Sequence, residues 1–217
     1  MSKSYPYGTG AVKWVSTEWL EDQLAEGVED QVEQEEFTLI DCQPNVHDYF
    51  QEHIPGAVYM NEGLFRVPRE GLPAQYVDPE VVQANLRRIG VEADLPVIVY
   101  TGLGPFKRWG DGLEQTMVAY TLARFGHENV YILDGGIDKW KGEGRPLSQI
   151  FPKVEPSNFS VEVQSEFYIE YEAFKEMKDQ EDVVVLDARP EDVYEGRGPW
   201  IKAGHIPGAV NLSWKHF

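Results

Sequence analysis

The chain holds few cysteine and histidine side chains, the residues that most often supply a thiol nucleophile or a zinc ligand. It has one cysteine, Cys42, and five histidines among 217 residues. The histidines do not stand at the spacing of zinc ligands, and one thiolate cannot complete a structural zinc site. We therefore predict no metal and no cofactor. A single cysteine also excludes an internal disulfide and suits a reducing compartment.

A repeated hexapeptide organises the elements that must position any reactive group. The sequence HIPGAV at residues 53–58 returns unchanged at residues 205–210, 152 positions later. Upstream of each copy an apolar run ends in an aspartate, Asp41 or Asp187, and a proline follows three residues later. Locally the hexapeptide predicts a turn that leads into a strand, because proline fixes φ and glycine allows positive φ. A period this long indicates two copies of one domain.

The repeat allows Cys42 to be compared with its counterpart in the second copy. Cys42 directly follows Asp41. The second copy has Ala188 at the same place. Cys42 is either a nucleophile at the end of a strand or a small, half-buried residue beside the turn. We favour the second interpretation and leave the first open.

Strands and helices alternate along the chain. Apolar strands are predicted at residues 37–41, 96–100 and 129–133, with helices at 16–25, 45–52, 78–90 and 113–125 and a closing helix around Trp140. Residues 61–77 are predicted to form a long loop, and residues 1–15 a loose lead-in. After a proline-containing stretch come a helix at 171–177 and a strand at 183–186. This alternation indicates parallel α/β units. We predict a domain at 1–148, a linker at 149–158 and the N-terminal part of a second domain at 159–217.

Composition narrows the range of partners. The net charge of −18 argues against nucleic acid and anionic membranes, which both attract positive charge. No apolar run approaches the ~20 residues of a membrane helix, and the first residues lack the apolar core of a signal peptide. We therefore predict a cytoplasmic protein. An anionic substrate would require a local cluster of arginine and lysine to overcome the overall field.

Over almost its whole length the chain resembles the rhodanese family of sulfurtransferases in tandem-domain form. The residues that carry the resemblance are 39–41 with the first HIPGAV, 97–100, 125–140, and 185–190 with the second HIPGAV. The resemblance implies two rhodanese-like domains, each a parallel sheet flanked by helices. It also implies a thiosulfate sulfurtransferase that uses a persulfide relay. A cysteine after the central strand takes sulfane sulfur from a small anionic donor and passes it to cyanide or a thiol.

This sequence departs from the family pattern at the cysteine. The position after the apolar-tyrosine strand is Thr101, which has no sulfur to load. The first domain therefore resembles a catalytically silent copy. Thr101 follows His53 by 48 positions, so the same spacing from His205 places the second cysteine near residue 253. We expect that the second domain is incomplete here, that a downstream segment or a separate C-terminal chain supplies the cysteine, and that these 217 residues alone are inactive.

The resemblance points to two substrate-binding arginines. Arg189 stands in the motif that the family uses for anions beside the persulfide loop, and its planar fork suits an oxyanion. An ion pair of Arg189 with Asp187 or Glu191 is the equally open structural interpretation. The family's second arginine is Val193 here, so Arg197 is the substitute candidate. Lys107 and Arg108 could contribute from the first domain.

Two classes of function follow. The first is the sulfurtransferase described above. The second is a non-catalytic rhodanese-like module that binds or regulates a partner. The signals of the mercaptopyruvate-using branch are not evident around residues 61–73, so a thiosulfate-like donor is the expected substrate.

Overall fold

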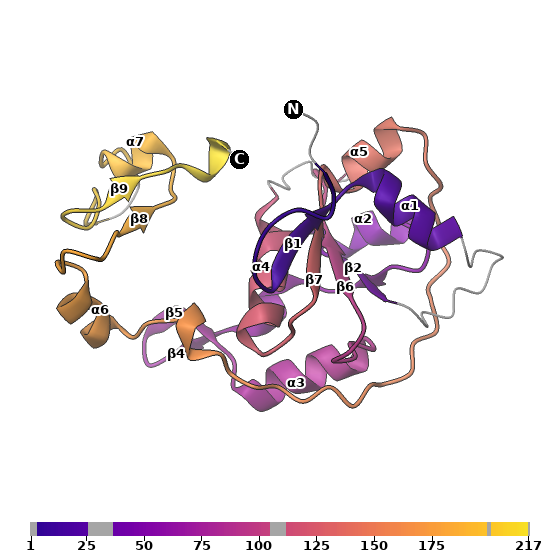
Figure 1. Ribbon diagram of the computed structural model, residues 1–217, viewed down its shortest axis with the longest axis horizontal. Helices are drawn as coiled ribbons and strands as arrows, with labels where there is room; N and C mark the ends of the chain where they lie inside the picture. The colour runs from indigo at the N-terminus through magenta and orange to yellow at the C-terminus, as the bar shows by residue number, and fades with distance from the viewer. Residues whose placement is uncertain (1–3, 26–36, 105–111, 199–200, 217) are drawn as a thin grey trace. The chain divides into compact units, whose positions relative to one another are not determined.

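The structure is a computed structural model, and it describes residues 4–25, 37–104, 112–198 and 201–216. The chain forms two compact units, Met1–Ser165 and Glu166–Phe217. Figure 1 shows the course of the chain through the elements of each unit. Among the described residues no helix has the length and apolar character needed to cross a membrane.

A five-stranded sheet forms the centre of the first unit. Its order is β1-β7-β6-β2-β3, and every pairing is parallel. The strands are β1 (Val12–Val15), β2 (Thr38–Asp41), β3 (Val58–Tyr59), β6 (Val97–Tyr100) and β7 (Val130–Leu133). The predicted α/β class with a parallel sheet is confirmed. Residues 12–15, predicted as part of a loose lead-in, are instead an edge strand, because their backbone pairs with β7.

Helices cover both faces of this sheet. They are α1 (Thr17–Ala25), α2 (Val46–Gln51), α3 (Pro79–Arg88), α4 (Leu113–Arg124) and α5 (Gly136–Gly142). Alternate residues of β6 point to opposite faces. Val97 and Val99 join a core cluster with side chains of α3 and α4. Ile98 and Tyr100 join a second cluster with side chains of α1 and α5. The central strand is therefore buried on both faces, as its apolar sequence predicts.

The prediction of a long loop at 61–77 is wrong. The segment forms a 3-10 helix, η1 (Glu62–Phe65), and an antiparallel hairpin of β4 (Arg66–Arg69) and β5 (Leu72–Tyr76). The hairpin turn has positive φ at both Glu70 and Gly71, 51° and 80°. Such a turn matches the twist of a hairpin but usually carries asparagine or aspartate before the glycine. Because this turn has glutamate at that position, the usual sequence pattern for a hairpin does not identify it.

The proline-containing segment after α5 lies against the first unit. Ser148 and His53 exchange two backbone hydrogen bonds of 3.0 and 2.8 Å. Further along, the Ser157 hydroxyl donates to the carbonyl O of Val91 at 2.5 Å, and the Phe159 side chain is buried in the α3–α4 core cluster. The compact first unit therefore extends to Ser165. The predicted domain limits at 148 and 159 stay predictions.

The elements of the second unit follow the same order as those from α1 to η1 in the first unit. Its elements are α6 (Tyr171–Met177), β8 (Leu186–Asp187), α7 (Glu191–Tyr194), β9 (Val210–Asn211) and a 3-10 helix, η3 (Trp214–His216); another short 3-10 helix, η2 (Ser165–Phe167), spans the division between the two units. β8 and β9 pair in parallel as a two-stranded sheet. The helix at 171–177 is as predicted, whereas the strand is shorter and lies later than the predicted 183–186.

Candidate functional site

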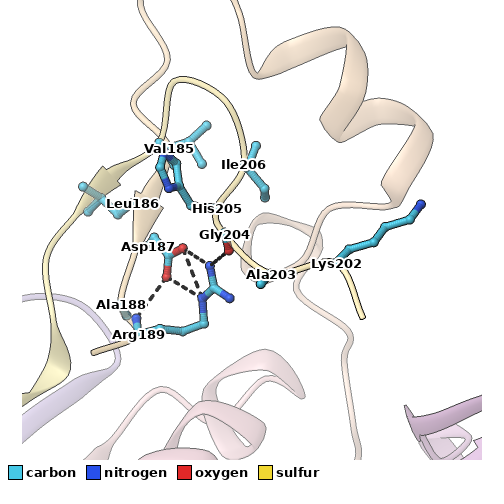
Figure 2. Close-up of a pocket in the computed structure, with 11 residues that line it drawn as sticks. Val185, Leu186, Asp187, Ala188, Arg189, Lys202, Ala203, Gly204, His205 and Ile206 are labelled. Atoms are coloured by element: carbon cyan, nitrogen blue, oxygen red, sulfur yellow. Dashed lines mark hydrogen bonds and ion pairs between the residues drawn. The ribbon is translucent and has the colours of Figure 1, made fainter. Parts of the chain in front are cut away.

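The second unit places Arg189 against Asp187 at the C-terminal end of β8. The backbone N–H and the Nε of Arg189 donate to Asp187 Oδ1 at 3.0 and 2.9 Å, and Nη2 donates to Oδ2 at 2.5 Å. Nη2 also donates to the carbonyl O of Gly204 at 2.9 Å. Figure 2 shows this network, in which the carboxylate fixes the plane of the guanidinium. The ion pair left open by the sequence is thus present in the structure.

The pair holds both groups in their charged forms. The side-chain hydrogen bonds from Arg189 hold the pKa of Asp187 below its ordinary value. The same bonds raise the pKa of Arg189. The Nη1 group of Arg189 makes no hydrogen bond to any residue in the described part of the chain. This amino group therefore remains available for an anion.

An open cavity of about 520 Å³ adjoins the pair. Its wall combines the end of β8 with the segment that leads into the second HIPGAV (Figure 2). The lining residues are Val185, Leu186, Asp187, Ala188, Arg189, Lys202, Ala203, Gly204, His205, Ile206 and Ala209. The sequence did not single out Lys202, whose side chain extends away from the Arg189 guanidinium in Figure 2.

Arg197, the other predicted substrate-binding residue, lies outside this wall. Its Nη1 lies 2.6 Å from Oε2 of Glu195, and 64% of its side chain is exposed. The structure thus brings Arg189, and not Arg197, to the cavity. Lys107 and Arg108 lie outside the described residues.

In the first unit the counterpart of Asp187 is Asp41, which is buried and has no arginine partner in the structure. Asp41 is fully buried, and its partner at the position of Arg189 is the neutral Gln43. Its Oδ1 accepts from the Gln43 N–H at 2.8 Å, and its Oδ2 accepts from Gln43 Nε2 at 3.0 Å. Burial raises the pKa of Asp41 to about 7, although these hydrogen bonds and one from the Tyr100 hydroxyl oppose the rise. The first copy therefore has a buried, proton-binding carboxyl where the second has an ion pair.

Thr101 occupies the predicted cysteine position at the end of β6. Its N–H donates to Gln115 Oε1 at 3.0 Å, and its hydroxyl donates to the carbonyl O of Cys42 at 3.3 Å. The Glu114 carboxylate lies 3.4 Å from the same hydroxyl. Two residues on, the Leu103 N–H donates to Asp138 Oδ2 at 2.7 Å. The described part of this loop is thus in contact with the carboxylates of Glu114 and Asp138.

Cys42 is poorly suited to be a nucleophile. The residue is 1% exposed. Burial raises the pKa of its thiol well above the ordinary value, and the charges of Asp41, Glu114 and Glu62 add to the rise. A buried, protonated thiol cannot attack a sulfur donor. The described residues also include no cluster of three or more histidine, cysteine or acidic side chains able to hold a metal ion.

Sequence reasoning missed the carboxylates beside Thr101. Asp138 lies in the first turn of α5, and Glu114 lies in the first turn of α4. Nothing in their spacing from Thr101 marks them as neighbours. Only the meeting of β6, α4 and α5 at one edge of the sheet brings them to the loop. Parallel strands gather the residues after their C-terminal ends in this way.

Comparisons with known proteins agree with this architecture. The profile of the rhodanese-like domain matches residues 18–143 and 170–216. The chain is 30% identical over 207 residues to a Synechococcus elongatus protein named "Putative thiosulfate sulfurtransferase", covering 95% of this chain and 60% of that protein. It is 28% identical over 216 residues to a 3-mercaptopyruvate sulfurtransferase of Escherichia coli, covering 92% of this chain and 73% of the relative.

A comparison with solved structures finds the same fold. The crystal structure of SseA from Escherichia coli, described as a 3-mercaptopyruvate sulfotransferase with the rhodanese fold, superposes with a TM-score of 0.73 at 25% identity. The match covers 93% of this chain and 74% of that one. Several relatives are thus longer than the 217 residues. The profile of the rhodanese-like domain matches most of the length of this chain. This chain therefore belongs to the rhodanese-like domain family.

Proposed function

We propose that these residues belong to a sulfurtransferase that moves sulfane sulfur from a thiosulfate-like donor to cyanide or a thiol. The first unit is the silent copy in this proposal. The sulfur-carrying cysteine lies beyond residue 217, near position 253 by the spacing of the repeat. The names of the relatives and the share of their length that the chain spans support this assignment.

One observation carries the proposal: Arg189 is fixed by Asp187 with its Nη1 still unpaired among the described residues. The first unit indicates where the cysteine would stand relative to it. There the hydroxyl of Thr101 lies 3.3 Å from the carbonyl O of Cys42. Cys42 corresponds to Ala188, the residue before Arg189. A cysteine at the equivalent place would therefore lie beside the arginine.

The chemistry needs a charged group at this place. The cysteine thiolate attacks the outer sulfur of thiosulfate, a new S–S bond forms, and the sulfur–sulfur bond of thiosulfate breaks to release sulfite. Cyanide or a thiolate then attacks the persulfide and carries the sulfur away. The donor is a dianion that approaches a chain of net charge −18. Arg189 supplies a local positive field and planar donors for the departing oxyanion.

A first experiment tests the assignment of the cysteine. The 217-residue chain is expected to form no thiocyanate from thiosulfate and cyanide, because Thr101 cannot carry sulfur and Cys42 is buried. The measurement is thiocyanate formation against a buffer blank, with Cys42→Ser as the control. Activity that survives repurification and disappears in Cys42→Ser would show that Cys42 is the carrier and that the proposal is wrong.

A second experiment tests Arg189 in the full-length protein. Arg189→Ala is expected to lower kcat/KM for thiosulfate roughly tenfold or more, and Arg189→Lys to recover only part of the loss. Arg197→Ala is the matched comparison, because Arg197 is an exposed arginine already paired with Glu195. Thermal melts check that each variant folds. Wild-type kcat/KM in a folded Arg189→Ala variant would leave the ion pair as a structural contact alone.

A non-catalytic binding module remains the second candidate, and the loop of the first unit favours it. The Glu114 and Asp138 carboxylates contact the loop that, by the resemblance to the family, would hold an anion in an active copy. If the full-length protein lacks a cysteine after its second apolar-tyrosine strand, this candidate replaces the enzyme. The intact mass of the native protein and its thiocyanate assay distinguish the two.

A further inference from the structure

The hairpin of the first unit packs an arginine and a tyrosine against α4. Arg66 begins β4 and lies opposite Tyr76, the last residue of β5. Cross-strand partners share one face of a hairpin, so both side chains point to the same side. The Tyr76 hydroxyl lies 3.1 Å from Oγ1 of Thr121. Arg66 Nη2 donates to Met117 Sδ at 3.7 Å. Both partners belong to α4, so this face of the hairpin lies on that helix.

A second arginine, Arg124, approaches the same ring from the end of α4. Its Cζ lies 4.3 Å from the centroid of the Tyr76 ring, and the Cζ of Arg66 lies 4.6 Å from it. Arg124 also donates a hydrogen bond to the side chain of Tyr120, one helical turn earlier. Burial raises the pKa of Tyr120, and the positive charges of Arg124 and Arg66 oppose the rise. Both guanidinium groups therefore lie near the Tyr120 hydroxyl.

The two arginines form a positive cluster on a chain of net charge −18. Both are half-buried, so their charges are less well hydrated than on an open surface. The contacts of Arg66 are neutral groups, namely the Ala74 carbonyl O at 3.3 Å, the Met117 sulfur and the Tyr76 ring. No carboxylate in the described part of the chain bonds Arg66. Stacking on an aromatic ring offsets only ~0.5–2 kcal/mol of the cost of such a cation. An external anion would therefore gain from both charges.

We propose that Arg66, Arg124 and the Tyr120 hydroxyl form a binding site for a small, doubly charged tetrahedral oxyanion. Each guanidinium presents planar N–H donors that fit two oxygens of such an ion. The Tyr120 hydroxyl accepts from Arg124 and still has its own hydrogen to donate. A tetrahedral dianion can face three donors at once, whereas a carboxylate has two oxygens and one charge. Sulfate and phosphate share this chemistry.

This site is separate from the loop that begins at Thr101. Arg124 is the last residue of α4, whereas Glu114, which contacts Thr101, lies in the first turn. These positions are about 15 Å apart along the helix axis. The C-terminal end of a helix also carries partial negative charge, which opposes an anion. We therefore expect weak binding, with a Kd of about 5 mM at low ionic strength. The site does not depend on sulfur transfer.

The test is a titration of the isotope-labelled 217-residue chain, followed by the NMR signals of the arginine Nε–H groups. Sodium sulfate and sodium phosphate are added in separate arms at constant ionic strength, set with sodium chloride. The signals of Arg66 and Arg124 are expected to shift together and to saturate with one Kd. Acetate is the control ion, because it is planar and carries one charge. We expect it to bind at least about tenfold more weakly.

Three variants separate a built site from general attraction to the surface. Arg66→Gln is expected to weaken sulfate binding about tenfold or more, because a charge-assisted contact is lost. Arg69→Gln is its control on the same strand, since Arg69 is exposed and already paired with Asp78 at 3.0 Å. This variant should leave the Kd unchanged. Tyr120→Phe keeps both cations and should weaken binding about threefold through the hydroxyl alone. Thermal melts check the folding of each variant, and Tyr120→Phe decides if Arg66→Gln does not fold.

The possible results are distinct. Absence of a saturable shift at Arg66 and Arg124 up to about 50 mM of either dianion would overturn the proposal. Equal weakening by Arg66→Gln and Arg69→Gln would overturn it as well, because the attraction would then belong to the whole surface. Acetate binding as tight as sulfate binding would refute the preference for a tetrahedral dianion. Saturation by phosphate alone would assign the site to phosphate groups, and saturation by sulfate alone to sulfur oxyanions.

Discussion

Replacing Asp41 by asparagine is expected to stabilise the first unit at neutral and alkaline pH. Asp41 is fully buried, so its ionised form loses the solvation that water gives it in the unfolded chain. Asparagine has nearly the same shape and carries no charge. Its amide also has a partner available, because the buried Oε1 of Gln43 has no hydrogen bond in the structure. A half-turn of the Gln43 amide would place that oxygen where Nε2 now faces Asp41.

The expected size follows from the pKa. A rise from 3.8 to about 7 corresponds to about 4 kcal/mol. Below pH 3.8 both states bind the proton and Asp41 has no effect. As the pH rises toward about 7 the unfolded chain releases the proton first, so the stability of the folded state falls. Above this range both states are ionised and the loss is complete. Between pH 5 and pH 8 the loss amounts to about 3 kcal/mol.

Thermal unfolding at pH 5 and pH 8 measures this difference. The gain of Asp41→Asn over wild type is expected to be larger at pH 8 than at pH 5 by roughly 6–12 °C, because one kcal/mol moves the melting temperature by roughly 2–4 °C at this size. Titration of the other groups cancels in the comparison. Asp187→Asn is the matched control. The pKa of Asp187 is lowered by Arg189, so its ionised form is the favoured one and the variant should lose stability at pH 8.

Two outcomes would refute the reasoning. An equal gain of Asp41→Asn at both pH values would show that the effect comes from packing and not from ionisation. A loss of stability at pH 8 would show that the folded protein favours the charged carboxylate, through hydrogen bonds from Gln43 and Tyr100 that outweigh its burial.

Two further predictions concern Gly136, which packs against the Thr101 carbonyl, and the buried thiol of Cys42. Gly136→Ala should destabilise the first unit by about 3 kcal/mol or more, since a Cβ there would lie 2.1 Å from the Thr101 carbonyl O and φ is 54°. Gly142→Ala, with nothing within 4 Å, is the control, and urea unfolding that finds the two alike would contradict the packing argument. Cys42 should react with a disulfide reagent about a hundredfold more slowly in the native chain than in urea, because the thiol is buried and protonated. Comparable rates, followed by absorbance, would show that the thiol is accessible.

The sequence by itself determined most of the helices of the first unit and the central strands of its sheet, but not the edge strand β1 or the hairpin of β4 and β5. The helix that starts at Pro79 and the strand at Val97–Tyr100 are local features, fixed by turn residues and by the period of the apolar side chains. The repeat also determined that two turns would be alike, and Gly56 and Gly208 take nearly the same φ, 79° and 85°. These features need no knowledge of distant residues, because each depends on a few neighbours in the chain.

Only the tertiary structure decided the state of the repeated aspartate. The same motif yields a buried carboxyl of raised pKa at Asp41 and an ionised partner of Arg189 at Asp187. The difference depends on whether a third strand covers the residue, as β6 covers Asp41. The tertiary structure also decided that Phe159 belongs to the core of the first unit. Burial and hydrogen bonding are set by residues far away in the chain, so the motif alone could not predict them.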